Sequence, residues 1–167
     1  MANILLTVET NLARELIGLI DEKLSELSRK STETEIADLL GYFDSMEHLT
    51  GLGFVTCQTY MTAVYGITKV DKKTALSFGP FHSYGASIAE VVNAAANYWK
   101  HNNEWSLDKT PKRREAIEAT FKDIGFPIGT EYPLSGILTE LAEPDDASFM
   151  PVMNKLRTWE NEVQNAA

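Results

Sequence analysis

The chain has 167 residues, of which 44% are hydrophobic and 23% charged, an ordinary composition for a globular domain long enough to bury its own core. Its net charge of −9 disfavours a nucleic-acid binder that works by overall charge, although a local basic site stays compatible with it. Cys57 is the only cysteine, which excludes an internal disulfide and a four-thiolate zinc site.

The first residues, MANILLTVETN, lack the basic start of a signal peptide, and their apolar run is short. No apolar run approaches the roughly 20 residues of a transmembrane helix. No internal repeat, low-complexity tract or long linker divides the chain. We therefore expect one domain over residues 1–167, cytoplasmic, away from the membrane and without a cofactor.

Helical spacing of apolar residues begins close to the N-terminus. Thr10 or Asn11 is expected to cap a first helix that runs to about Lys30. Thr32 and Glu35 form a capping-box pattern, which predicts the start of a second helix. The apolar positions that keep helical spacing in the first of these segments are Leu12, Leu16, Leu19, Ile20, Leu24 and Leu27.

Two glycines interrupt the apolar pattern of the second helix. Gly51 and Gly53 are expected either to end it or to let another backbone come close. The following segment, 54–65, has the β-branched and aromatic content of a strand, but it also presents one apolar helical face. We favour a helix, because a single strand here would have no partner.

The rest of the chain also reads as helical. A loop-rich connection over 66–84 contains a candidate short helix at 71–77, and Ser83 or Ser87 begins a central helix. Three further helices are expected from Thr110–Pro111 to about 123, from Tyr132–Pro133 to about 142, and over 148–165. Five to seven helices with short connections predict an all-α, single-domain helical bundle.

The central helix, within 85–105, carries the least ordinary polar residues. Asn93, Asn97 and His101 are spaced at i, i+4 and i+8, so they line up on one side. Asn and His are weaker helix formers than Glu, Lys or Gln, which a purely solvated face would favour. The row therefore hints at a function that charged side chains would not provide.

Asn97, Lys100 and His101 are the candidate catalytic residues. The imidazole of His101 can act as a general acid or base, Asn97 can orient it or bind a phosphate oxygen or ribose hydroxyl, and Lys100 can stabilise an anion. This set suits metal-independent RNA cleavage by a 2′-hydroxyl. The alternative, which is the commoner use of such a pattern, is a solvated face whose protonated His is favoured by the helix dipole.

Asn97 and His101 resemble part of the signature of the HEPN superfamily: an Arg, commonly an Asn after it, then three residues and a His on one helix. Members are helical bundles, often dimeric, among toxin–antitoxin and phage-defence ribonucleases. The Arg position is Ala96 here, and Lys100 does not occupy it. The resemblance therefore implies a degenerate, non-catalytic relative.

Other residues offer weaker candidate sites. Asp44 and His48 are one helical turn apart, but no HExxH or ExxH motif accompanies them, so we expect no metal site. A basic cluster opens the helix near 111, at the end where the helix dipole disfavours cations, and this points to an anionic partner. Together with Asn93, the candidate binding residues are Glu104, Trp105, Lys112, Arg113 and Arg114, with Lys109 beside them. Trp105 also offers a ring for base stacking with Tyr98 and Trp99.

Two functions follow from these residues. The first is a non-catalytic interaction or regulatory module, dimeric and related to defence or toxin–antitoxin systems, whose partners are a second copy or another protein. The second is a HEPN-like, metal-independent endoribonuclease that uses Asn97 and His101, with RNA as its substrate.

Overall fold

The structure is a computed structural model that describes residues 2–105 and 111–167; the side chains at 2, 3, 111 and 113 are outside that description. The described residues are helical with short connections and two isolated bridges, which confirms the predicted all-α bundle. The elements are α1 (Ala2–Thr32), α2 (Tyr42–Thr68), α3 (Lys72–Leu76), α4 (Ile88–His101), a 3-10 turn η1 (Asn102–Glu104), α5 (Pro111–Asp123), α6 (Pro133–Ala142) and α7 (Phe149–Asn165).

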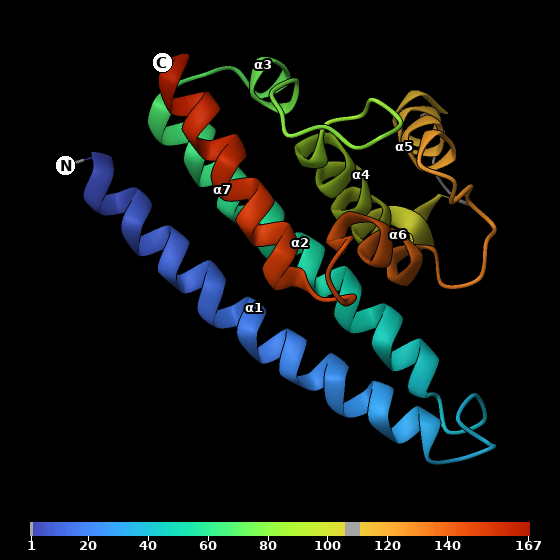
Figure 1. Cartoon of the computed structure of the whole chain (residues 1–167). Coiled ribbons are helices and arrows are strands. Elements are labelled where there is room, and N and C mark those ends of the chain that lie inside the picture. Colours follow the sequence, from blue (N-terminus) through green and yellow to red (C-terminus); the bar gives the residue numbers. More distant parts are fainter. Residues whose placement is uncertain (1, 106–110) are drawn as a thin grey trace.

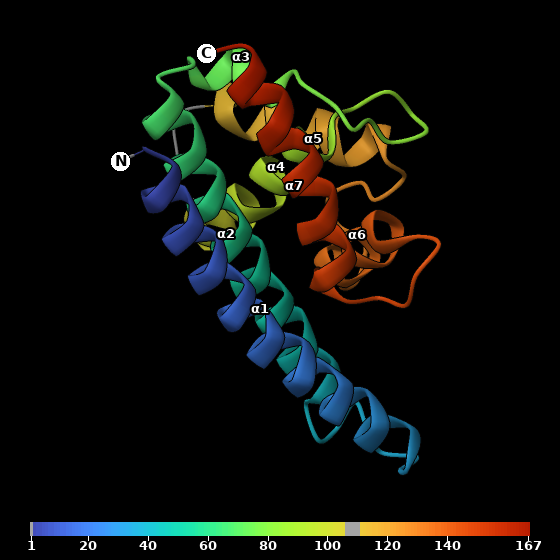
Figure 2. The same ribbon diagram turned by 60° about the vertical axis from the view of Figure 1, so that its left-hand side comes forward.

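The two longest helices, α1 and α2, form an antiparallel hairpin that runs diagonally across the molecule (Figure 1). Helix α7 packs against both of them, and α4 packs on α2, with α5 and α6 completing that side. Figures 1 and 2 both show the connecting end of the hairpin, around residues 33–41, projecting beyond the other helices. The body of the bundle therefore covers only part of α1.

The first two helix boundaries predicted from the sequence are wrong. Thr10 lies inside α1, where its buried hydroxyl donates to the Leu6 carbonyl at 2.7 Å instead of capping a helix start. Thr32 ends α1, with its hydroxyl on the Arg29 carbonyl at 2.8 Å, and α2 begins at Tyr42. Helix α1 extends beyond Thr10 at its N-terminal side because Leu6 continues its buried stripe.

Gly51 and Gly53 do not end the second helix, because α2 continues through them to Thr68. A Cβ atom on Gly51 would lie 1.8 Å from Trp99 Cδ1, and one on Gly53 would lie 2.2 Å from Phe149 Cε2. The glycines therefore admit two aromatic rings from α4 and α7, where another backbone was the expected neighbour. The helix predicted for residues 54–65 is confirmed.

The other predicted helices are confirmed, with shifted ends. Asp71 caps α3 through the Lys73 and Thr74 N–H groups. Ser87 caps α4, accepting from the Glu90 N–H at 2.9 Å, and α4 ends at His101, within the predicted stretch 85–105. The helices from 111, 133 and 149 match the predictions closely, although Thr110 lies outside the described residues.

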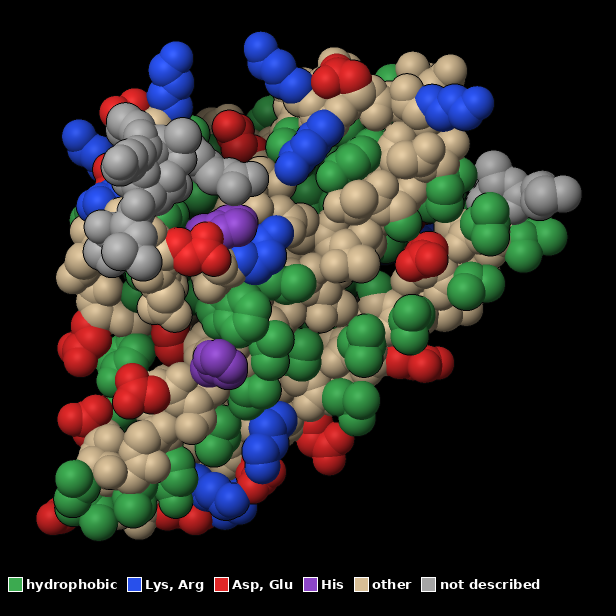
Figure 3. Space-filling view, turned by 180° about the vertical axis from the view of Figure 1, so that it is seen from behind, with side chains coloured by type: hydrophobic (Ala, Val, Ile, Leu, Met, Phe, Trp, Pro, Cys, Tyr) green, Lys and Arg blue, Asp and Glu red, His purple; other side chains and the backbone are tan. Residues whose placement is uncertain are grey.

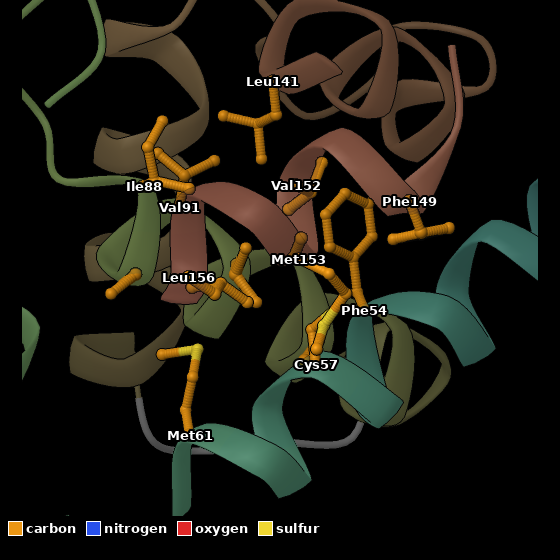
Figure 4. Packing of buried hydrophobic residues seen from close by; sticks show 14 of the residues in the cluster. Phe54, Cys57, Met61, Ile88, Val91, Leu141, Phe149, Val152, Met153 and Leu156 are labelled. Carbon is orange, nitrogen blue, oxygen red and sulfur yellow. The ribbon is translucent and has the colours of Figure 1, made fainter. Parts of the chain in front are cut away.

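The core lies where α2, α4, α6 and α7 meet, and Figure 4 shows the side chains interdigitating. Phe54 and Phe149 pack edge to face with ring centroids 5.0 Å apart. Cys57 is fully buried beside Met153, and burial raises the pKa of its thiol, as is typical of an unreactive core cysteine. The other labelled core residues are Met61 from α2, Ile88 and Val91 from α4, Leu141 from α6, and Val152 and Leu156 from α7.

Candidate functional site

The asparagine row of α4 is tied to α2 by Gln58, a nearly buried residue that the sequence analysis did not single out. Gln58 Nε2 donates to Asn93 Oδ1 at 3.0 Å and to Asn97 Oδ1 at 3.2 Å. Lys100 Nζ donates to Gln58 Oε1 at 2.6 Å. Three of the candidate residues therefore meet in one network, and that network joins two helices.

His101 is held by a different partner. Its Nδ1 lies 3.2 Å from Glu104 Oε2 in η1, and its side chain is 28% exposed. The hydrogen bonds of Asn97 and His101 thus lead to Gln58 and to Glu104 respectively. Ala96, at the position of the HEPN arginine, is fully buried, so this position faces the core and presents no cation to a substrate.

The candidate binding residues near the start of α5 are partly engaged. The Arg114 guanidinium lies 5.6 Å from the Trp105 ring centroid, and its Nε pairs with Glu118 at 2.6 Å. Trp105 in turn packs on Tyr98 at 5.4 Å. Lys112 is exposed, while Lys109 and the Arg113 side chain lie outside the described residues. The expected basic cluster therefore shows one exposed lysine and one arginine that stacks and pairs.

No group of three or more His, Cys, Asp or Glu residues that could hold a metal ion occurs among residues 2–105 and 111–167. His82 pairs with Glu140, Nε2 to Oε1 at 2.9 Å. His48 packs its ring edge-on against Trp99, with centroids 5.2 Å apart. These histidines therefore have structural contacts of their own.

Among the described residues, two cavities stand out by their volume. The larger, of about 850 Å³, is bounded by α1, α2, α6 and the start of α7, with many hydroxyl side chains in its wall. Asp21 lies in that wall and accepts from the Phe149 and Met150 N–H groups at 2.7 and 3.0 Å. Burial raises the pKa of Asp21, and the two backbone hydrogen bonds oppose that rise.

The smaller cavity, of about 400 Å³, lies between the N-terminal turns of α2, the C-terminal end of α4 and the start of α6. Glu47 in its wall accepts from the Leu134 N–H at 2.8 Å and the Ser135 N–H at 2.9 Å. Tyr98 and Trp99 are also in the wall, so two aromatic residues that the sequence analysis grouped with Trp105 do meet in a cavity.

Helix α1 exposes a second apolar stripe beside its buried one. Of the six apolar positions that keep helical spacing in the sequence, only Leu24 and Leu27 are buried. Seen from behind (Figure 3), hydrophobic side chains follow one another along the edge formed by the α1–α2 hairpin. The exposed members, here called the α1 stripe, are Ile4, Leu5, Val8, Leu12, Leu16 and Leu19, each between 43% and 69% exposed.

No protein-family model, curated protein or solved structure matches the chain. Within the described part of the chain, every helix is too short or too polar to cross a membrane.

Proposed function

We propose that the chain is a non-catalytic interaction module that works as a homodimer, with the α1 stripe at the centre of its interface. The stripe carries this proposal because contiguous apolar surface of this extent marks an interaction site in soluble proteins. Asn97 and Lys100, two of the candidate catalytic residues, hydrogen-bond with Gln58 of α2, which supports a role in joining helices.

The stripe has a symmetric spacing that suits a second copy of the same chain. Leu5 and Leu19 are equally far from Leu12 along α1, and so are Val8 and Leu16. A two-fold axis beside Leu12 therefore sets Leu5 against Leu19 of the partner subunit and Val8 against Leu16 of the partner subunit. Such self-complementarity is what a two-fold interface requires, and the stripe spans about 22 Å of helix.

The neighbouring face of α2 extends the apolar surface. The hydroxyls of Thr56 and Thr59 donate back to the Leu52 and Val55 carbonyls at 3.0 and 2.9 Å, so these hydroxyls need no partner in an interface. A shallow groove of about 120 Å³ separates α1 from α2 at this level. The two hairpins of a dimer would thus pack as four helices.

The apolar burial in such an interface is similar in size to the cost of association. Full burial of a Leu, Ile or Val side chain contributes about 1.5–3 kcal/mol, and these six are roughly half exposed, so each contributes about 1 kcal/mol. The two stripes together contribute about 12 kcal/mol, against an association cost of about 4–15 kcal/mol. A charge placed at the symmetric centre should therefore be enough to separate the subunits.

The test is the mass in solution, measured by light scattering, of the wild type, Leu12→Glu and Leu39→Glu. Leu39, in the connection between α1 and α2, is 83% exposed and lies outside the stripe, so it is a matched control. We expect a dimeric wild type and a dimeric Leu39→Glu, with Leu12→Glu folded at the 18.6 kDa of one chain. A wild type that stays monomeric at tens of micromolar, or a Leu12→Glu that stays dimeric, would refute the proposal.

A HEPN-like endoribonuclease is the second candidate. It is favoured by the pairing of His101 with the Glu104 carboxylate, since a carboxylate partner orients a histidine for proton transfer. This function ranks second because Asn97 and Lys100 already hydrogen-bond with Gln58. Incubation with a broad RNA panel in EDTA decides: cleavage that disappears in His101→Ala would establish it, and intact RNA would leave the interaction module.

A further inference from the structure

The smaller cavity has walls that are already organised for a ligand. Its volume of about 400 Å³ falls within the range of small-molecule sites. The rings of Tyr98, Trp99 and Tyr132 and the imidazole of His48 stand in its lining. None of its lining residues belongs to α1, so the cavity is separate from the α1 stripe.

Contacts behind the cavity hold two of these rings in place. Trp99 fits against α2 where Gly51 has no Cβ, and its ring also has an edge-on contact with His48 of the same helix. Tyr98 packs between Phe121 at 5.1 Å and Trp105 at 5.4 Å. A site whose rings are already held loses little side-chain freedom when a ligand enters.

Acidic side chains lie in and around the cavity. Asp44 is exposed in the wall; burial is the largest cause that raises the pKa of Tyr132, and the charges of Asp44, Asp38 and Glu131 add to the rise. The C-terminal end of α4, which carries the negative end of its helix dipole, also opens here at Asn102, while the positive N-terminal end of α6 in the same wall is capped by the Glu47 carboxylate. The described lining residues include no lysine or arginine.

We propose that this cavity binds a small organic cation, a quaternary ammonium or protonated amine, held by cation–π contact with Trp99 and Tyr132 and by the charge of Asp44. Aromatic faces attract such cations through their quadrupole, and a nearby carboxylate adds Coulombic attraction. An anion would meet the acidic groups, and a neutral ligand would gain nothing from Asp44. Glu47 acts as a positioning residue, because its carboxylate holds the start of α6, beside Tyr132, in place.

The test is an NMR titration of the full chain with choline and with its neutral isostere, 3,3-dimethylbutan-1-ol. We expect choline to shift resonances of the cavity residues with a Kd of about 1–10 mM and the isostere to bind at least about tenfold more weakly. Asp44→Asn should weaken choline binding about fivefold, and Trp99→Leu about tenfold or more. Asp145→Asn, an exposed change of the same charge in the α6–α7 connection, should leave it unchanged.

Three results would overturn the proposal. The first is that choline causes no saturable resonance shift up to roughly 100 mM. The second is that the neutral isostere binds as tightly as choline, and the third is that the shifted resonances belong to residues away from the cavity. Asp44 is exposed, so its variant reports on binding even if Trp99→Leu fails to fold. Because the stripe and the cavity share no residues, loss of the dimer in Leu12→Glu tests one proposal and the choline titration tests the other.

Discussion

Helix α6 depends on a carboxylate that comes from another helix. Tyr132 precedes its first residue in a left-handed conformation, with φ of 51°, and gives no side-chain cap. Glu47 of α2 takes over that role by accepting from the Leu134 and Ser135 N–H groups and, at 2.7 Å, from the Ser135 hydroxyl. Replacing Glu47 with Gln keeps the shape of the side chain but leaves one oxygen and removes the charge.

We expect Glu47→Gln to lower the free energy of unfolding by about 2 kcal/mol. A hydrogen bond to a charged group is worth about 1.5–3 kcal/mol, and a negative charge at a helix N-terminus about 0.3–1 kcal/mol. Partial exposure of Glu47 limits the loss, because water can replace part of what is removed. The estimate is therefore set at the low end of the combined range.

Urea unfolding followed by far-UV circular dichroism measures this loss as a lower midpoint at an unchanged m-value. Glu22→Gln is the matched control, because Glu22 is an exposed glutamate of α1 and we expect its variant to stay within about 0.5 kcal/mol of the wild type. If Glu47→Gln unfolded at the same urea concentration as Glu22→Gln, the capping role assigned to Glu47 would be refuted.

Three other changes have defined expectations. Gly53→Ala should lower Tm by about 4–8 °C, since the clash with the Phe149 ring outweighs the gain in helix propensity, and an equal or higher Tm would contradict the packing described here. Tyr60→Phe should cost about 1.5–3 kcal/mol in urea unfolding, because it removes the hydroxyl that donates to the buried Glu160 carboxylate; an unchanged midpoint would count against that bond. The raised pKa of Asp21 means that the folded state binds this proton more tightly than the unfolded state, so ionised Asp21 costs stability. As the pH falls from 7 towards 4, the free energy of unfolding of the wild type should therefore rise relative to that of Asp21→Asn. A difference in the free energy of unfolding that does not change with pH would exclude this linkage.

The helical fold was predictable because its signal is local and repeated. Ser87 and Asp71 cap their helices as their sequence positions indicate, and the helically spaced Val152, Leu156, Trp159 and Val163 of α7 are buried. The helix start predicted from the capping-box pattern at Thr32 was wrong, because this prediction also used local sequence alone. A cap is needed only where a helix starts, and α1 was still helical at that residue.

The glycines of α2 and the stripe of α1 were not predictable, because tertiary neighbours decide both. A glycine pair in a helix reads as a break until Trp99 and Phe149 are known to occupy the space beside it. Leu12 and Leu24 both belong to the apolar pattern of α1, but they lie about 120° apart around the helix, and one is half exposed while the other is buried. Periodicity indicates that an apolar face exists, but it does not say which other element covers it.

The asparagine row was recognised as unusual, but its hydrogen-bond partner was not identified. Its partner, Gln58, is 35 residues away in the chain from Asn93, so no spacing rule connects them. One signal was present: a glutamine inside the apolar run around Cys57 must find hydrogen-bond partners when it is buried. The search for those partners would have led to the polar row on the central helix.

Several charged side chains of this bundle hydrogen-bond to the backbone at the end of a neighbouring helix. Asp21 of α1 caps α7 and Glu47 of α2 caps α6, while Lys155 of α7 donates to the Leu141 and Glu143 carbonyls at the other end of α6, at 2.7 and 2.8 Å. Folding therefore explains why these charged side chains are where they are. It does not explain the α1 stripe or the acidic residues around the aromatic cavity, since neither adds to the described core. Exposed apolar side chains lower solubility, and clustered acidic groups repel one another. Features that carry such a cost and do not stabilise the fold indicate a binding surface, and both proposals rest on features of this kind.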